Sequence, residues 1–191
     1  SRPRASLVPL PAPPARARLA RANLPRPPLP LPTVHSPMEF ARAAFADAQR
    51  ALADFLPLAP RVDTVALALA NAIRAGGKVL ICGNGGSLCD AIHFAEEMTG
   101  RFRNDRPPLP AIALADAGHI TCTANDYGFE HVFSRAVEAL GKPGDVLIAL
   151  STSGNSENIL RAVHAANARR LATVALLGKG GGKLKGQCTH E

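Results

Sequence analysis

The sequence lacks any apolar run long enough to cross a membrane, although 47% of its 191 residues are apolar. A transmembrane helix needs about 20 consecutive apolar residues, so no membrane span is expected. The sequence also lacks a C-x-x-C pair among its four cysteines, and no hydrophobic signal peptide precedes them. Cys82, Cys89, Cys122 and Cys188 are therefore interpreted as reduced thiols of a cytoplasmic protein.

Residues 1–37 lack acidic side chains, and they hold six arginines and eleven of the seventeen prolines. Because proline fixes φ and removes a backbone donor, this leader is predicted to be disordered, with some polyproline character. A targeting segment, a basic nucleic-acid arm and a Pro-rich docking ligand are alternatives. We favour non-functional upstream sequence, with Met38 as the natural start.

Residues 38–191 are close to charge balance, with 16 basic and 15 acidic side chains. Six of the seven net positive charges thus belong to the leader, and no nucleic-acid partner is expected for the globular part. A chain of this length forms one domain.

From Met38 onward the pattern predicts helices and short buried strands. Two helices come first, at 39–56 and 61–77, separated by Pro57 and Pro60. The apolar runs KVLIC, PAIALA, DVLIAL and ATVALLG then predict strands at 78–82, 110–115, 145–150 and 172–178, with helices at about 87–99, 129–140 and 156–170. Residues Val132, Phe133, Ala136, Val137 and Leu140 are expected to face inward. This alternation is typical of α/β proteins with a doubly wound parallel sheet.

Two loops follow predicted strands, and ligands bind at the carboxyl ends of such strands. In GNGGS (83–87) the glycines let backbone approach a ligand, and Ser87 is a candidate helix cap. In STSGNS (151–156) hydroxyls and backbone amides meet at a helix N-terminus, which suits a phosphate. The loop 151–156 is not a nucleotide P-loop, because it lacks the lysine of G-x-x-x-x-G-K-[ST]. The loop 83–87 is not a dinucleotide-binding loop, because it lacks the glycine spacing G-x-G-x-x-G.

His93 and Glu97 are four residues apart in the helix after GNGGS, so their side chains share a face. Such a pair can bind one metal ion, usually zinc. Glu96 is nearly as well placed, so spacing alone does not choose between the two glutamates. Without further context, an ordinary helix with a half-buried histidine and solvated acids is the favoured interpretation.

CGNGGS, H-x-x-x-E, NDYGF and STSGNS in this order resemble phosphoheptose isomerase, a family with the sugar isomerase (SIS) fold. The resemblance runs from about Glu39 to Lys185 and is dense over 76–161. It implies an aldose–ketose isomerase that converts sedoheptulose 7-phosphate to D-glycero-D-manno-heptose 7-phosphate through an enediol, for lipopolysaccharide heptose. It also implies a cytoplasmic homotetramer with sites at subunit interfaces.

The resemblance implies a role for each matched residue. His93 and Glu97 would be zinc ligands, and Glu97 also the catalytic base, which decides between Glu96 and Glu97. The substrate-binding positions would be Asn84, Gly85, Gly86, Glu97, Asn125, Asp126, Ser151, Thr152, Ser153 and Ser156. This chemistry fits the residue types, since isomerisation needs a carboxylate base, a polarised carbonyl and a phosphate anchor.

The resemblance stops near Lys185. In the family a further strand and a long helix follow, and that helix carries a Gln and a His that complete the zinc site. Gln187 and His190 lie where the family has loop sequence, and we interpret them as coincidental matches. The SIS domain at 38–191 is therefore expected to be incomplete, with two of four zinc ligands and impaired activity or stability, as a fragment or after a frame shift.

Two other functions are weighed against the isomerase. One is a non-catalytic SIS module that binds phosphosugar or a partner such as a replication initiator. The pair His93 and Glu97 disfavours it, because an adaptor has no reason to keep zinc ligands. The other is a nucleic-acid-binding protein that acts through the leader.

Overall fold

The computed structural model describes residues 37–191, and the prediction of a disordered leader falls outside them except at Pro37. The chain divides into two compact units, Ser1–Ala48 and Gln49–Glu191. Helix α1 (Pro37–Phe55) runs across this boundary. No helix in the described part is long and apolar enough to span a bilayer.

The prolines between the first two helices mark a change of helix, as predicted. A short 3₁₀ turn, η1 (Leu56–Leu58), contains Pro57, and α2 (Ala59–Arg74) has Pro60 in its first turn. A helix tolerates proline there because the first amides have no partner within the helix. Both predicted helices are therefore confirmed.

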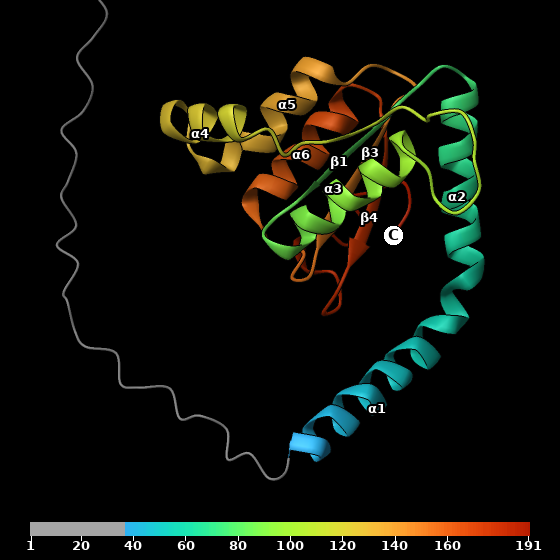
Figure 1. The fold of residues 1–191 in the computed structure, drawn as a ribbon. Coiled ribbons are helices and arrows are strands. Elements are labelled where there is room, and N and C mark those ends of the chain that lie inside the picture. The colour runs from blue at the N-terminus through green and yellow to red at the C-terminus, as the bar shows by residue number, and fades with distance from the viewer. Residues whose placement is uncertain (1–36) are drawn as a thin grey trace, which may run out of the picture. The chain divides into compact units, whose positions relative to one another are not determined.

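The second unit contains a four-stranded parallel sheet in the order β2-β1-β3-β4 (Figure 1). The strands are β1 (Val79–Gly83), β2 (Ala111–Ala113), β3 (Val146–Ser151) and β4 (Ala172–Leu177). The helices that follow them are α3 (Gly86–Thr99), α4 (Ala117–Asp126), α5 (Val132–Leu140) and α6 (Glu157–Ala168), and two further 3₁₀ turns are η2 (Phe129–His131) and η3 (Gly182–Leu184). The predicted α/β class and all four strands are confirmed.

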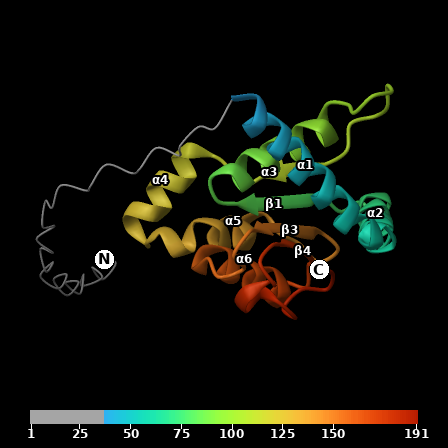
Figure 2. The same cartoon turned by 90° about the horizontal axis from the view of Figure 1, so that it is seen from below.

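Alternating side chains of β1 show why helices cover both faces of the sheet. Val79 and Ile81 pack with the core formed by α2 and α3. Leu80 and Cys82 pack with the other core, which α5 and α6 cover. Figure 2 shows β1 and β3 side by side along their length, and Figure 1 shows α2 on one side of the strands and α5 and α6 on the other. A parallel sheet buried on both faces needs such continuous apolar strands.

Two details of the helices differ from the predictions. Helix α4 was not predicted, and its N-cap residue is Asp116, whose side chain accepts a hydrogen bond of 2.6 Å from the His119 amide. Leu140, expected to face inward, is 41% exposed and is the last residue of α5.

Asp145 ties together the chain at the amino ends of β1 and β3. Its carboxylate pairs with the Lys78 ammonium and accepts hydrogen bonds from the amides of Lys78 (2.9 Å) and Lys142 (2.8 Å). Burial opposes ionisation of Asp145, but the hydrogen bonds and the charge of Lys78 outweigh it and lower its pKa.

We predict that Asp145→Asn lowers the free energy of unfolding by about 1–3 kcal/mol at neutral pH, because buried donors lose a charged acceptor. A lowered pKa stabilises the fold above the unfolded-state value of about 3.9, and this stabilisation is lost as pH falls through the folded-state value. Urea unfolding from pH 7 to pH 3 should therefore show a smaller acid-dependent loss in the variant.

The matched control is Glu157→Gln, which breaks the exposed ion pair of Glu157 with Arg161 (2.8 Å). An exposed pair contributes about 0.5 kcal/mol or less, so this variant should unfold like the parent. Equal losses for the two variants would contradict a special role for Asp145.

Candidate active site

The loop after β1 is shaped by close backbone packing. Gly83 has no room for a side chain, because a Cβ there would lie 2.7 Å from the Ser87 backbone. Gly85 has a φ of +57° and is the N-cap residue of α3. The prediction that Ser87 caps this helix is wrong, since Ser87 lies inside the first turn and its amide donates to the Asn84 carbonyl (3.1 Å). Gly85 and Gly86 are exposed, so their backbone can be approached.

The loop after β3, residues 151–156, is held by its own serines. Ser151 is buried, and its Oγ accepts a hydrogen bond of 3.0 Å from the Gly154 amide. Ser153 Oγ accepts one of 3.2 Å from the Asn155 amide. Each hydroxyl keeps its proton for a ligand, because in these bonds it only accepts. Thr152 is exposed, and Ser156, the N-cap of α6, makes no side-chain cap bond.

A glycine-rich segment, residues 178–184, packs directly on the loop 151–156. A Cβ on Gly154 would lie 1.8 Å from the Gly181 carbonyl oxygen, and one on Gly182 would lie 2.3 Å from the Ser153 carbonyl oxygen. The Leu184 amide donates to the Gly154 carbonyl (3.0 Å), and the Leu184 side chain is fully buried. Sequence reasoning missed this segment, although its run of three glycines signalled a close backbone approach.

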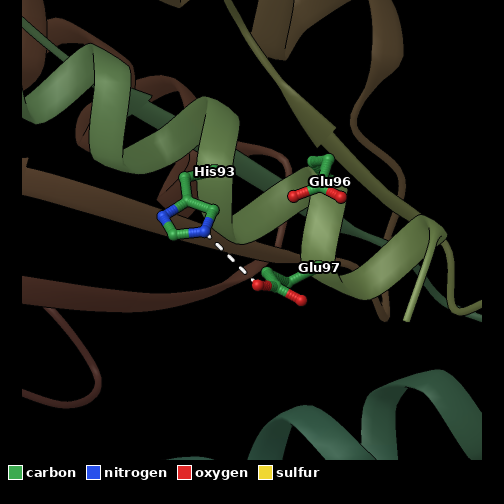
Figure 3. Close-up of side chains that lie close together, drawn as sticks. All are labelled: His93, Glu96 and Glu97. Atoms are coloured by element: carbon green, nitrogen blue, oxygen red, sulfur yellow. Dashed lines mark ion pairs between the residues drawn. The ribbon is translucent and has the colours of Figure 1, made fainter. Parts of the chain in front are cut away.

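His93, Glu96 and Glu97 form the cluster with metal-ligand potential in the described residues, with ligand atoms within 4.8 Å of one another. Figure 3 shows the His93 ring turned toward Glu97, with 3.3 Å between Nε2 and Oε1. The His93 side chain is 73% exposed and that of Glu97 is 31% exposed, so both are accessible. Helical spacing predicted this face correctly.

Arg106 holds the end of α3 that carries Glu97, and sequence reasoning did not identify it. Its guanidinium donates to the backbone carbonyls of Glu97 (2.5 Å) and Met98 (2.9 Å). These carbonyls belong to the last turn of the helix, where a cation is favourable.

Four further candidates lie at the end of α4 and in residues 187–191. Asn125 and Asp126 are exposed at the end of α4, where the Asn125 amide donates to Asp126 (2.8 Å). His190 pairs through its backbone with β4 at Val174, and it does not belong to the cluster formed by His93, Glu96 and Glu97. The Gln187 carbonyl accepts a bond from Asn167 (3.0 Å).

The cysteines near the sheet are poor nucleophiles. Burial and the nearby Cys188 raise the pKa of Cys82 to about 12. Burial and the negative charge of Glu191 raise the pKa of Cys188 to about 11, although a hydrogen bond with Thr173 acts to lower it. Since the thiolate is the reactive form, both groups stay unreactive at neutral pH.

The geometry favours an anion seat at the loop 151–156 and a carboxylate–imidazole pair on the helix after the neighbouring loop. β1 and β3 are paired from Val79↔Val146 to Gly83↔Leu150, so the two loops leave adjacent strand ends. The strand order reverses between β1 and β3, which is where α/β sheets bind ligands.

We predict that Gly154→Ala disrupts the anion seat, because its φ of +64° disfavours a side chain and the Gly181 oxygen leaves no space for one. Affinity for inorganic phosphate, measured by calorimetry, should fall at least about tenfold, a change that corresponds to 1.4 kcal/mol.

Gly180→Ala is the matched control, because Gly180 has a φ of +78° in the adjacent segment but nothing within 4 Å of the added Cβ. This variant carries backbone strain without the clash, so its phosphate affinity should stay within about threefold of the parent. Equal weakening by both variants would mean that strain alone, and not the packing of the two loops, matters.

Comparison with known proteins places these features in a family. The family model for the SIS domain matches residues 44–178. The chain is 62% identical over 129 residues to phosphoheptose isomerase from Fusobacterium nucleatum, covering 68% of this chain and 66% of that protein. It is 50% identical over 156 residues to phosphoheptose isomerase from Yersinia pestis, covering 80% and 81%.

Two solved structures share the fold. Phosphoheptose isomerase from Neisseria gonorrhoeae superposes with a TM-score of 0.74 at 44% identity, over 78% of this chain and 79% of that one. The enzyme of the same name from Francisella tularensis gives a TM-score of 0.77 at 38% identity, over 81% and 82%. The chain belongs to the SIS domain family and, within it, to the phosphoheptose isomerases.

Proposed function

We propose that this chain is an aldose–ketose isomerase that converts sedoheptulose 7-phosphate to D-glycero-D-manno-heptose 7-phosphate, a precursor of lipopolysaccharide heptose. The observation that carries the proposal is the position of Glu97 beside His93 on α3, the helix after the loop 83–87. The loop 151–156, which suits a phosphate, follows β3, the strand paired with β1. Membership of the phosphoheptose isomerases supports the same activity.

The loop 151–156 would bind the sugar phosphate. Ser151, Thr152, Ser153 and Ser156 supply hydroxyls beside the N-terminus of α6, whose dipole favours an anion. The sugar itself would contact the backbone of Asn84, Gly85 and Gly86, and also Asn125 and Asp126. Anchoring the remote phosphate would hold the reacting carbons in a fixed place.

Glu97 would act as the base of the isomerisation. Its carboxylate takes a proton from C1 of the ketose, which gives an enediol, and returns a proton to C2. A second proton moves from the oxygen on C1 to the oxygen on C2, so that the ketone becomes a hydroxyl and C1 becomes an aldehyde. Partial exposure of Glu97 leaves it accessible to the sugar.

The cluster fits a zinc ion in part. An imidazole nitrogen and carboxylate oxygens within 4.8 Å of one another are donors that zinc accepts, and His93 and Glu97 would hold it. When bound, zinc would supply a Lewis acid that polarises the carbonyl and stabilises the developing negative charge. Zinc prefers four ligands, so groups beyond His93 and Glu97 must complete the site.

The first two helices support a homo-oligomer, which we propose to be a tetramer in the cytoplasm. Large apolar side chains along α1, η1 and α2 are exposed, with Phe45 at 73% and Leu52 at 72%. The others are Phe40, Phe55, Leu56, Leu58, Val62 and Leu67. Soluble monomers rarely expose so many large apolar groups along consecutive elements, and the cores of homo-oligomer interfaces are rich in them.

We predict that Glu97→Gln lowers isomerase turnover by about 10²–10⁴-fold, because the amide keeps the size of the side chain but cannot accept the C1 proton. The measurement is conversion of sedoheptulose 7-phosphate in zinc-containing buffer. It is made on the chain itself and on a fusion that continues after Lys185 with the C-terminal part of the Yersinia pestis relative. Zinc content and activity should both be higher in the fusion, because more ligands become available.

Glu96→Gln is the matched control on the same helix and removes the same charge. It should keep turnover within about threefold of the parent form, since the base is Glu97. Equal loss in both variants would contradict the assignment of the base. Absence of conversion in both the chain and the fusion would overturn the proposed function.

We predict that Leu52→Glu with Leu56→Glu shifts the protein to a smaller species, because buried charges would oppose association through these helices. Light scattering after size exclusion measures the mass. Leu140→Glu, an exposed apolar site on α5, is the control and should keep the parent mass. An unchanged mass in the double variant would place the interface elsewhere.

A further inference from the structure

Asn84 and Asn158 form a reciprocal pair of amide hydrogen bonds. Asn84 Nδ2 donates to Asn158 Oδ1 at 2.9 Å, and Asn158 Nδ2 donates to Asn84 Oδ1 at 2.9 Å. Asn158 is only 3% exposed, although it is a polar residue on α6. A buried amide without partners would be costly, so the pair stabilises both side chains in one orientation.

The pair joins the two candidate ligand loops. Asn84 follows β1 directly, and Asn158 lies in the first turn of α6, two residues after Ser156. The two asparagines are 74 residues apart in the sequence. Their contact therefore spans the point where the strand order reverses, with the proposed sugar-binding residues 84–86 on one side and the proposed phosphate-binding loop 151–156 on the other.

The pair also restricts how Asn84 can meet a ligand. Its side-chain oxygen accepts from Asn158, and its backbone carbonyl accepts from the Ser87 amide (3.1 Å). The Asn84 side chain therefore orients the loop, and contact with the sugar is left to the backbone of residues 84–86, of which Gly85 and Gly86 are exposed.

We propose that Asn158 is a positioning residue. It fixes the spacing between the phosphate-binding loop 151–156 and the sugar-binding loop 83–87, and so selects the length of the sugar phosphate that binds. This inference rests on the proposed function. Glu97 can reach C1 only when the phosphate at the other end of the sugar is held at the matching distance. A displacement of about 1 Å in such a site can cost about 10²-fold in rate.

The proposal makes a specific prediction for ligands of different length. In Asn158→Leu, the size is kept but both amide bonds are lost, and Asn84 is free to turn. Affinity for sedoheptulose 7-phosphate should fall about 10–100-fold by calorimetry. Affinity for inorganic phosphate should change by less than about threefold, because residues 178–184 still hold the loop 151–156. Preference over the six-carbon fructose 6-phosphate should fall by the same 10–100-fold.

A second variant covers the case in which Asn158→Leu does not fold. Asn158→Ala loses both amide bonds, like Asn158→Leu, but it adds neither bulk nor a charge beside the loop 151–156. It should show the same separation between sedoheptulose 7-phosphate and inorganic phosphate, with a smaller shift in melting temperature.

Asn167→Leu is the matched control on the same helix. The Asn167 side chain also makes two hydrogen bonds, to the Gln187 carbonyl (3.0 Å) and from Thr173 Oγ1 (3.1 Å), but at the far end of α6. This variant should lower the melting temperature and leave the ratio of the two affinities unchanged, as expected for a structural role.

The outcomes separate this inference from the proposed function. If the parent chain binds sedoheptulose 7-phosphate and the Asn158 variants bind it equally well, or lose both ligands equally, the positioning role is overturned while the proposed function stands. If the parent chain does not bind the sugar phosphate, both are overturned. Selective loss in the Asn158 variants, absent from Asn167→Leu, supports the positioning role.

Discussion

The parallel pairing of β1 with β3 is the constraint on which the candidate site depends. Both strands are almost completely buried, and their register runs without interruption from Val79↔Val146 to Gly83↔Leu150. A slip of one residue would move every side chain to the other face of the sheet and so exchange the residues that pack in the two cores. Because the register is fixed in this way, the loops that begin at Asn84 and Ser151 must start side by side, and the site follows from the packing of the sheet.

Close backbone packing extends this constraint from the strands to the loops. Gly83 admits the backbone of α3, and Gly154 admits the segment that contains Gly181. These contacts fit because no side chain intervenes, and Leu184 anchors the second segment in the core. The loops are therefore preorganised by contacts outside the ligand-binding surface, which reduces the entropy lost on binding.

Sequence reasoning predicted the parts of the fold that depend on local periodicity. The four strands are short apolar runs, and α3, α5 and α6 carry regular apolar spacing, so all were predicted within a few residues. Helix α4 was missed because AGHITCTAND contains Gly118 and three β-branched residues, which lower its intrinsic helix propensity. The face shared by His93 and Glu97 was predictable from spacing, whereas the bond between Asn84 and Asn158 was not, because no local pattern relates residues that meet only through the strand order.

The phosphate seat illustrates why neutral donors suit this chemistry. In the proposed site, hydroxyls and amides at the start of α6 would bind an anion through directed hydrogen bonds, whose directions the bonds of Ser151 and Ser153 with the amides of Gly154 and Asn155 would fix in advance. A flexible ammonium would attract the phosphate as strongly, but it would orient it less, because its charge is a point on a mobile stem. An isomerase gains little from tighter ground-state binding alone, since only interactions that align C1 and C2 with the base lower the barrier. In the proposed isomerase, the geometry of the loop, more than its charge, would therefore make remote phosphate binding useful to Glu97.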